Sequence, residues 1–155
     1  MISFTVPGVA QPAGSKRAFA HKTTGRIVVV DDAKGSRRWK SDVAKVARNH
    51  VRAPLDGPVK LEVLFVMPRP KSHFGTGRNA CVLKSSAPAW PAVKPDTTKL
   101  LRAVEDALNG VIWRDDAQVV VQTACKVYGD PARCEITVRP IAAQLSIHQE
   151  RSAAA

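Results

Sequence analysis

The chain has 155 residues, a formal net charge of +11 at pH 7 and a pI near 10.1, and 45% of its residues are hydrophobic. This length suits one domain with a real core, and the apolar fraction excludes a chain that is disordered throughout. The charge favours nucleic acid as a partner over an anionic membrane, because no basic amphipathic helix with bulky apolar residues opposite and no lipidation motif stands out.

The location of the protein follows from what the sequence lacks. No apolar run approaches the roughly 20 residues of a membrane-spanning helix, and the N-terminus has no basic start followed by an apolar stretch. The three cysteines form no C-x-x-C pair, which fits a reducing compartment. We therefore expect a cytoplasmic protein without membrane contact, in which Cys125 and Cys134 are small buried hydrophobes.

The N-terminal half is predicted to alternate strands with one helix. A strand over residues 2–7 precedes a loop over 11–26 that is rich in Gly, Pro and basic residues and contains Lys16 and Arg17. A second strand is expected over 27–30, with Asp31 and Asp32 as turn and capping residues. A helix follows, with Ser36 as its N-cap and an apolar stripe reaching Val51, and then a central strand over 59–67.

Residues 69–95 show no regular periodicity and contain no acidic residue. Loops of this length are uncommon in compact domains and are usually functional or disordered. Basic residues interleaved with His73, Phe74 and Trp90 suit contact with phosphates and unstacked bases. The alternative is a disordered surface insertion whose charge only aids solubility. On the first interpretation the DNA-binding residues are Lys16 and Arg17 together with Arg69, Lys71, Arg78, Lys84 and Lys94.

The C-terminal part predicts a helix and a hairpin. The helix begins at Asp96 or a following threonine, carries an apolar face from Leu100 to Leu108 and stops at Gly110. Strands are expected over 119–127 and 133–140, and residues 141–155 form a flexible, weakly helical tail. The whole predicts an α+β fold in which a mixed β-sheet carries two main helices, within a single domain over residues 1–140.

Three aspartates are candidates for chemistry. Asp96 opens the second helix, and Asp115 and Asp116 stand side by side after Trp113, which is more often a core anchor than a base-stacking platform. Aspartate oxygens are preferred ligands of Mg²⁺, and a metal between acids on a basic surface activates water against a phosphodiester. Aspartates at caps and turns are commonly structural, however, so composition alone leaves both interpretations open.

A resemblance favours the metal site. The stretch "KPDTTKLLRAVEDALNGVIWRDDAQVV", residues 94–120, resembles the RusA family of Holliday junction resolvases, which are small homodimeric Mg²⁺-dependent endonucleases common in phages and prophages. Asp96 matches the family's first acid, the run from Asp106 to Leu108 matches the helix end, and the element from Trp113 to Val119 matches the last motif. The opening "VPGVAQPAGSKRAF" is similar to the family's N-terminal strand and basic loop.

The resemblance implies a RusA-like fold and a site in which Asp96, Asp115 and Asp116 bind Mg²⁺, with Mn²⁺ as a substitute. Asp96, Asp116, Lys99 and Arg102 would be catalytic, the two cations facing the cut phosphate. The chain departs from the family at two positions: Thr98 replaces the second acid, and Arg102 replaces a catalytic lysine. An arginine keeps the charge but does not readily give up a proton.

The predicted function is therefore Mg²⁺-dependent cleavage of four-way DNA junctions during recombination and repair, by a homodimer in a bacterial cell, with a phage or prophage as a source of the gene. A homodimer is implied because a four-way junction is two-fold symmetric and paired incisions need two active sites. The alternative, favoured by Thr98 and Arg102, is a branched-DNA-binding protein of the same fold without nuclease activity. An RNA-binding module has little support, because aromatic residues are few.

Overall fold

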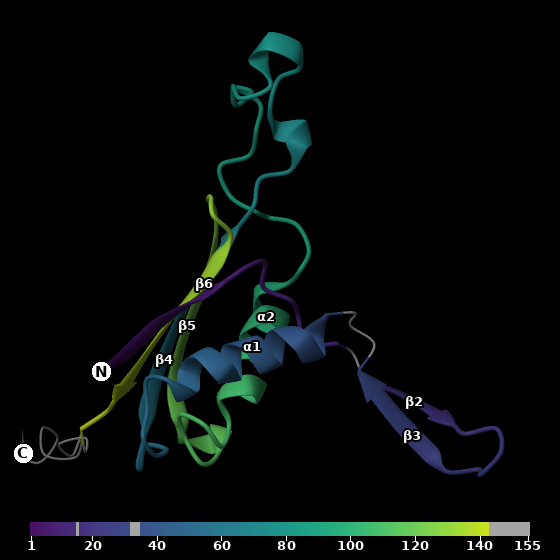
Figure 1. The fold of residues 1–155 in the computed structure, drawn as a ribbon, viewed down its shortest axis with the longest axis vertical. Helices are drawn as coiled ribbons and strands as arrows, with labels where there is room; N and C mark the ends of the chain where they lie inside the picture. Colours follow the sequence, from purple (N-terminus) through teal and green to yellow (C-terminus); the bar gives the residue numbers. More distant parts are fainter. Residues whose placement is uncertain (15, 32–34, 143–155) are drawn as a thin grey trace, which may run out of the picture.

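A computed structural model describes residues 1–14, 16–31 and 35–142 (Figure 1). Its strands are β1 (Ile2–Pro7), β2 (Lys16–Ala20), β3 (Ile27–Asp31), β4 (Val59–Met67), β5 (Val119–Tyr128) and β6 (Arg133–Pro140). Its α-helices are α1 (Ser36–Arg48) and α2 (Thr97–Leu108), and three 3₁₀ turns are η1 (Lys71–His73), η2 (Gly77–Asn79) and η3 (Asp116–Gln118). No helix in these ranges is long and apolar enough to cross a membrane.

The main sheet has four strands in the order β1-β6-β4-β5. β6 pairs antiparallel with both β1 and β4, whereas β4 and β5 are parallel. Parallel neighbours cannot be joined by a tight turn, so the chain from β4 to β5 needs a long crossover. Helix α2 supplies this crossover, and the mixed sheet predicted from the sequence is confirmed.

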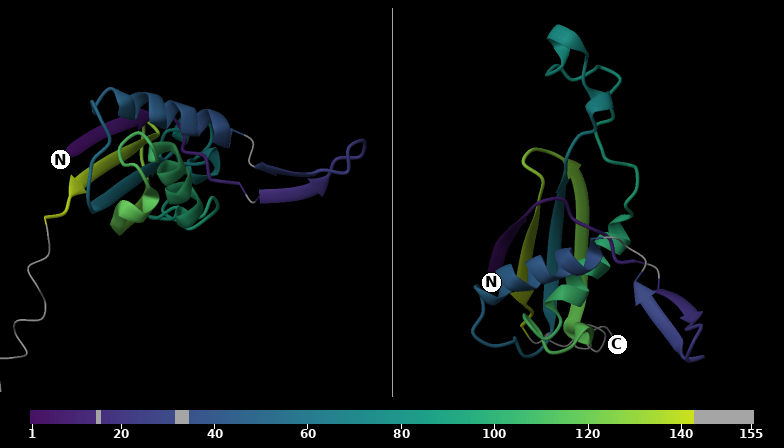
Figure 2. Two further views of the ribbon diagram at one scale, coloured as in Figure 1. Left: turned by 90° about the horizontal axis from the view of Figure 1, so that it is seen from below. Right: turned by 45° about the vertical axis from the view of Figure 1, so that its right-hand side comes forward.

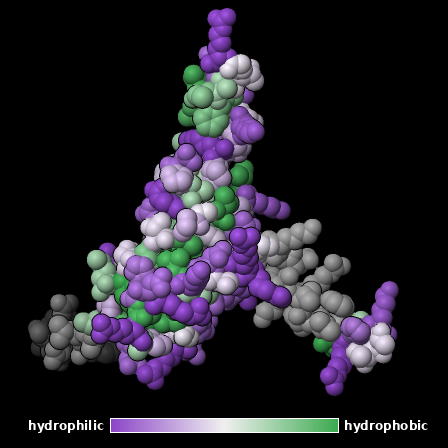
Figure 3. Space-filling model, in the orientation of Figure 1, coloured by the Kyte–Doolittle hydropathy of each residue, from purple (hydrophilic) through white to green (hydrophobic). Residues whose placement is uncertain are grey.

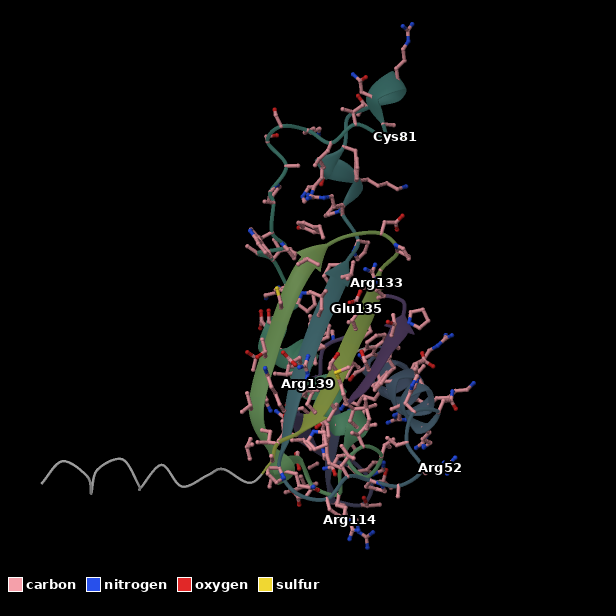
Figure 4. The ribbon with its side chains drawn as sticks, turned by 90° about the vertical axis from the view of Figure 1, so that its left-hand side faces the viewer. Arg52, Cys81, Arg114, Arg133, Glu135 and Arg139 are labelled. Carbon is pink, nitrogen blue, oxygen red and sulfur yellow. The ribbon has the colours of Figure 1, made fainter. Side chains whose placement is uncertain are left out.

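Both helices lie on one face of the main sheet (Figure 2), where alternate strand residues are buried. Cys134, Ile136 and Val138 of β6 face this side and are fully buried. The other face of the sheet is open and carries charged pairs, visible at Arg133, Glu135 and Arg139 in Figure 4. Arg139 and Lys60 both pair with Glu62, at 3.2 and 3.1 Å. The fold is thus an α+β domain of two layers.

Strands β2 and β3 form a separate antiparallel hairpin that stands away from the sheet (Figures 1 and 2). Residues 16–20 were predicted as loop, and this prediction was wrong. The alternation in "KRAFA" is too short to predict a strand, and the pairing with β3 across the turn at 21–26 supplies the missing hydrogen bonds. Lys16 and Arg17 are the first two residues of β2.

Two smaller expectations fail for local reasons. Ser36 is the first residue of α1 and is buried, and the N-cap is Gly35, whose φ of 87° is a conformation that glycine adopts without strain.

Cys125 is exposed, because it lies on the open face of the main sheet. Cys134 is buried as expected, and burial raises the pKa of its thiol to about 12. Asp31 ends β3, while Asp32 and the tail from residue 143 onward lie outside the described residues.

Residues 69–95, here called the arm, extend away from the carboxyl end of β4 (Figure 1). The arm is folded back on itself: Phe74 and Leu83 form an antiparallel bridge, and the backbone N–H of Lys84 donates to the carbonyl of His73 at 2.9 Å. Hydrophilic and hydrophobic residues are mixed along it in Figure 3, and Val82 and Trp90 are exposed. The expectation of a stretch without regular periodicity holds, but local hydrogen bonds give it a defined path.

Candidate functional site

Helix α2 places the candidate acids. It buries Leu100, Ala103, Val104, Ala107 and Leu108 and leaves the rest of its surface toward solvent. Asp96 is its N-cap residue, with the backbone in an extended conformation and no capping hydrogen bond from the side chain. The Asp96 carboxylate is exposed and lies 3.9 Å from the ammonium group of Lys99 one turn later, which is also exposed. An exposed carboxylate, paired with a cation, therefore stands at this end of the helix.

The other acids lie beyond the far end of α2, in the loop "WRDDAQ". Trp113 anchors the loop in the core, where it is fully buried, as predicted. Gln118 fixes the loop's shape: its amide nitrogen donates to the carbonyls of Leu55 and Gly57 at 3.0 and 2.9 Å, and its oxygen accepts from the backbone N–H of Arg114 at 2.8 Å. The two adjacent aspartates are presented by this rigid loop.

Asp115 and Asp116 have different partners. Asp115 is the N-cap of η3, and its carboxylate accepts from the backbone N–H of Ala117 at 2.8 Å. Asp116 accepts from the side-chain amide of Asn109, the C-cap residue that follows α2, at 3.1 Å. Asp115 is thus used in part by its own loop, whereas Asp116 is turned toward the end of α2.

The structure does not bring Asp96 together with Asp115 and Asp116 within one chain. The 12-residue helix α2 lies between them and is about 18 Å long at 1.5 Å per residue. Among the described residues, no group of three or more His, Cys, Asp or Glu side chains is placed to hold a metal ion. The side chains of a single chain therefore do not fit the three-aspartate metal site expected from the sequence.

Glu105 of α2 is a further acidic residue near Asp116 that the sequence did not indicate. Glu105 is half-buried and accepts a hydrogen bond from the amide of Gln122 on β5. Burial raises its pKa, and the charges of Asp116 and Asp106 raise it further, while the bond from Gln122 and the charge of Arg102 lower it. Glu105 lies four residues before Asn109, which puts the two residues on the same helix face. This spacing is the signal in the sequence that could have placed Glu105 near Asp116.

The cations of α2 divide between the two ends. Lys99 lies beside Asp96, whereas the charge of Arg102 acts on Glu105. Asp106 pairs with Lys40 of α1 at 2.7 Å, so it serves the contact between the helices. Each end of α2 therefore carries at least one carboxylate with a cation near it.

The basic residues of the arm fall into two groups. The guanidinium of Arg69 lies 4.5 Å from the ring centre of Tyr128 and donates to the carbonyl of Pro88, and the ammonium of Lys84 donates to the carbonyl of Ser72. These two cations hold the arm together. Lys71, Arg78 and Lys94 are exposed, and their side chains make no hydrogen bond or ion pair with another described residue, so their charge is open to a partner.

The region that contains both ends of α2 matches a known family. A family model described as "Endodeoxyribonuclease RusA" matches residues 9–139. The chain belongs to the RusA endodeoxyribonuclease family. The match begins in the loop after β1 and includes the hairpin, the arm and all the acids discussed above, so the resemblance inferred from residues 94–120 is confirmed.

A relative with similarity over nearly the whole chain is the uncharacterized protein YqaN of Bacillus subtilis (strain 168). It is 33% identical over 143 residues, which cover 92% of this chain and 98% of that protein. The name of this relative assigns no activity, so the function is inferred from the family membership.

The environment of Glu105 makes a prediction about stability. Because the folded-state pKa of Glu105 lies above its unfolded value, the folded protein loses stability as the pH rises through that interval. Glu105→Gln keeps a partner for Gln122 and removes a charge near Asp116. It should be more stable than the wild type at pH 7 by about 0.2–0.5 kcal/mol, the usual cost of like charges on a helix surface, which is about 1 °C in Tm.

Thermal unfolding between pH 4 and pH 8 measures this effect, and the advantage of the variant should shrink toward the acid end. Asp106→Asn is the control, because it removes a neighbouring charge but breaks the ion pair with Lys40 and should bring no gain. A Glu105→Gln variant that is less stable than the wild type at pH 7 would contradict the raised pKa of Glu105.

Proposed function

We propose that this protein is a divalent-metal-dependent endonuclease that cuts four-way DNA junctions as a homodimer. Membership of the RusA endodeoxyribonuclease family over residues 9–139 carries the proposal. A net charge of +11 and the open cations of the arm support a polyanionic substrate. Exposed carboxylates at Asp96 and Asp116 support a divalent metal, because hard cations take carboxylate oxygens.

The separation of the two acids leads to a specific form of the proposal. A two-fold axis across the middle of α2 would run the helices of two subunits in opposite directions. The Asp96 end of one subunit would then lie near the Asp116 end of its partner, twice per dimer. Each site would draw Asp96 and Lys99 from one chain and Asp116 from the other, with Asp115 a weaker candidate because it already caps η3.

The chain's own groups have definite roles in such a site. When bound, a divalent metal supplies an activated water and neutralises charge on the cut phosphate. Asp96 and Asp116 would hold it, and Lys99 would place its ammonium group against the phosphate. Arg102 would add charge from mid-helix, but it would not deliver a proton. Thr98 brings no charge where the resemblance expects an acid, so Asp116 of the partner chain becomes the more necessary ligand.

The rival function is binding of branched DNA without cutting. The observations that favour it are Thr98 and Arg102 and the lack of a three-carboxylate group within the described part of one chain. Both functions predict the same affinity for junctions, and only cleavage separates them.

Cleavage of a synthetic four-way junction tests the main proposal. In Mg²⁺ or Mn²⁺ the purified protein should introduce paired nicks, and EDTA should abolish them. Asp116→Asn should reduce the rate by at least about 100-fold, since it removes a charged ligand. Asp42→Asn, an equally exposed aspartate of α1, is the matched control and should cut normally. Tight binding without nicks in either metal would establish the rival function.

Mixing two inactive variants tests whether the site is shared. Equal amounts of Asp96→Asn and Asp116→Asn chains, refolded together, should form heterodimers in half of the molecules. If each site uses acids from both chains, such a heterodimer holds one intact site and one doubly altered site. Nicking of a single strand should therefore return in the mixture. If the mixture stays as inactive as either variant alone, the acids of a site come from one chain.

Salt dependence tests the role of the arm. The affinity for a junction should fall steeply with salt, and Lys71→Ala and Arg78→Ala should each reduce the slope of log K against log salt by about 1. Lys45→Ala, an exposed lysine of α1, is the control and should leave the slope unchanged. If Lys71→Ala and Arg78→Ala both keep the wild-type slope, as Lys45→Ala should, the arm is not part of the DNA-binding surface.

A further inference from the structure

A pocket of about 410 Å³ opens beside Asp96 at the start of α2, a size within the range of small-ligand sites. Its walls come from three parts of the chain: the segment after β1, the end of β4 and the start of α2. The lining residues are Val9, Ala10, Gln11, Pro12, Met67, Lys94, Pro95, Asp96 and Lys99. Most of this lining is apolar, and the charged groups are all contributed by residues 94–99.

Hydrogen bonds within the protein hold the walls of the pocket in place. The backbone N–H of Ala13 donates to the carbonyl of Lys99 at 2.8 Å, which ties the segment after β1 to α2. The ammonium of Lys126 donates to the carbonyls of Val93 and Pro95 at 2.9 and 2.8 Å, which holds the opposite wall. Ala10 is almost fully buried beneath. A ligand would therefore meet fixed walls and lose little free energy in ordering them.

Gln11 gives the pocket a polar group that can discriminate. Its amide nitrogen donates to the carbonyl of Val9 at 3.1 Å, and its side chain makes no other hydrogen bond to a described residue. As far as the described residues go, one N–H and the amide oxygen are left for a ligand. A donor beside an acceptor matches the hydrogen-bonding edge of a nucleobase.

A second hollow of about 150 Å³ adjoins the first and shares Val9, Met67, Lys94 and Pro95 with it. It leads toward Tyr128 and the base of the arm. Lys94, Lys99 and Lys126 line the two hollows, and Asp96 is the one acid among their described lining residues. An apolar floor beneath a row of cations suits a base that lies inside while its phosphates stay at the rim.

We propose that the pocket receives one unpaired nucleobase of the DNA, from the nucleotide whose phosphate lies at Asp96, and that Gln11 helps to select this base. The inference rests on the proposed endonuclease function and adds a source of sequence preference to it. A paired base cannot enter a pocket of this kind, and a base at a branch point costs less to unpair than one inside a duplex. The cutting position would then depend on which base can be accepted.

The fluorescence of 2-aminopurine tests occupancy without any need for cutting. The probe is placed at each position around the branch point of a synthetic junction, and the protein is added in EDTA. Fluorescence should rise at one position, because the probe leaves the base stack and no aromatic residue lines the main pocket. Val9→Phe fills the mouth of the pocket from a partly exposed position and should abolish the rise. Val120→Phe, an exposed valine of β5, is the matched control and should preserve it.

The role of Gln11 is tested by the distribution of cuts. Junctions that carry each of the four bases at the responsive position are cut by the wild type and by Gln11→Leu, a substitution of similar volume. The relative rates among the four should change by about 3- to 10-fold, the effect of a hydrogen bond gained or lost. Asn49→Leu removes an exposed amide at the end of α1, outside the pocket, and should leave the ranking of the bases unchanged.

The outcomes separate the two proposals. A fluorescence rise that Val9→Phe abolishes, in a protein that never cuts, supports the pocket and overturns the endonuclease function. If the protein cuts junctions normally but no probe position shows a rise in fluorescence, the base pocket is overturned. A rise that Val9→Phe leaves intact overturns it as well. Normal cutting with an unchanged ranking in Gln11→Leu overturns the role of Gln11.

Discussion

The five apolar residues that α2 buries, Leu100, Ala103, Val104, Ala107 and Leu108, pack against the core beneath it. The parallel strands β4 and β5 can be joined only by a crossover, and α2 is that crossover. Fully burying a leucine contributes about 1.5–3 kcal/mol, so this stripe holds the helix in one place and one rotation. The position of the helix in turn sets which residues lie at its two ends and which face solvent between them.

The packing of α2 explains which acidic residue lies at each end of the helix and why the two residues are far apart. Asp96 precedes the first turn, and Asp116 meets the residue that ends the last turn. The rigid packing that presents each carboxylate also keeps the two apart in a single chain. The proposed shared site across a two-fold axis would satisfy the packing and the chemistry together, and it would match the two-fold symmetry of a four-way junction. Gln118 contributes at a distance, because it locks the loop that carries Asp115 and Asp116 to the turn before β4.

The high positive charge is used in two ways. Arg69, Lys84 and Lys126 donate to backbone carbonyls and give the arm and its base a defined path. Under the proposed function, Lys71 and Arg78 would meet phosphates on an arm that those contacts hold out from the sheet. The same contacts of Lys126 also fix a wall of the pocket beside Asp96. Internal hydrogen bonds of some cations thus position the surface on which the others act.

The sequence by itself determined the α+β class, the main helices and strands, the buried Trp113 and the family, because hydrophobic periodicity and short motifs are local properties of the chain. It did not determine the strand over 16–20, whose hydrogen bonds come from β3, or the exposure of Cys125, which depends on the face of the sheet left open. The distance between Asp96 and Asp116, the link from Glu105 to Asp116 and the pocket around Gln11 were decided only by the tertiary structure. Each depends on where α2 packs, and that is set by contacts between residues far apart in the chain.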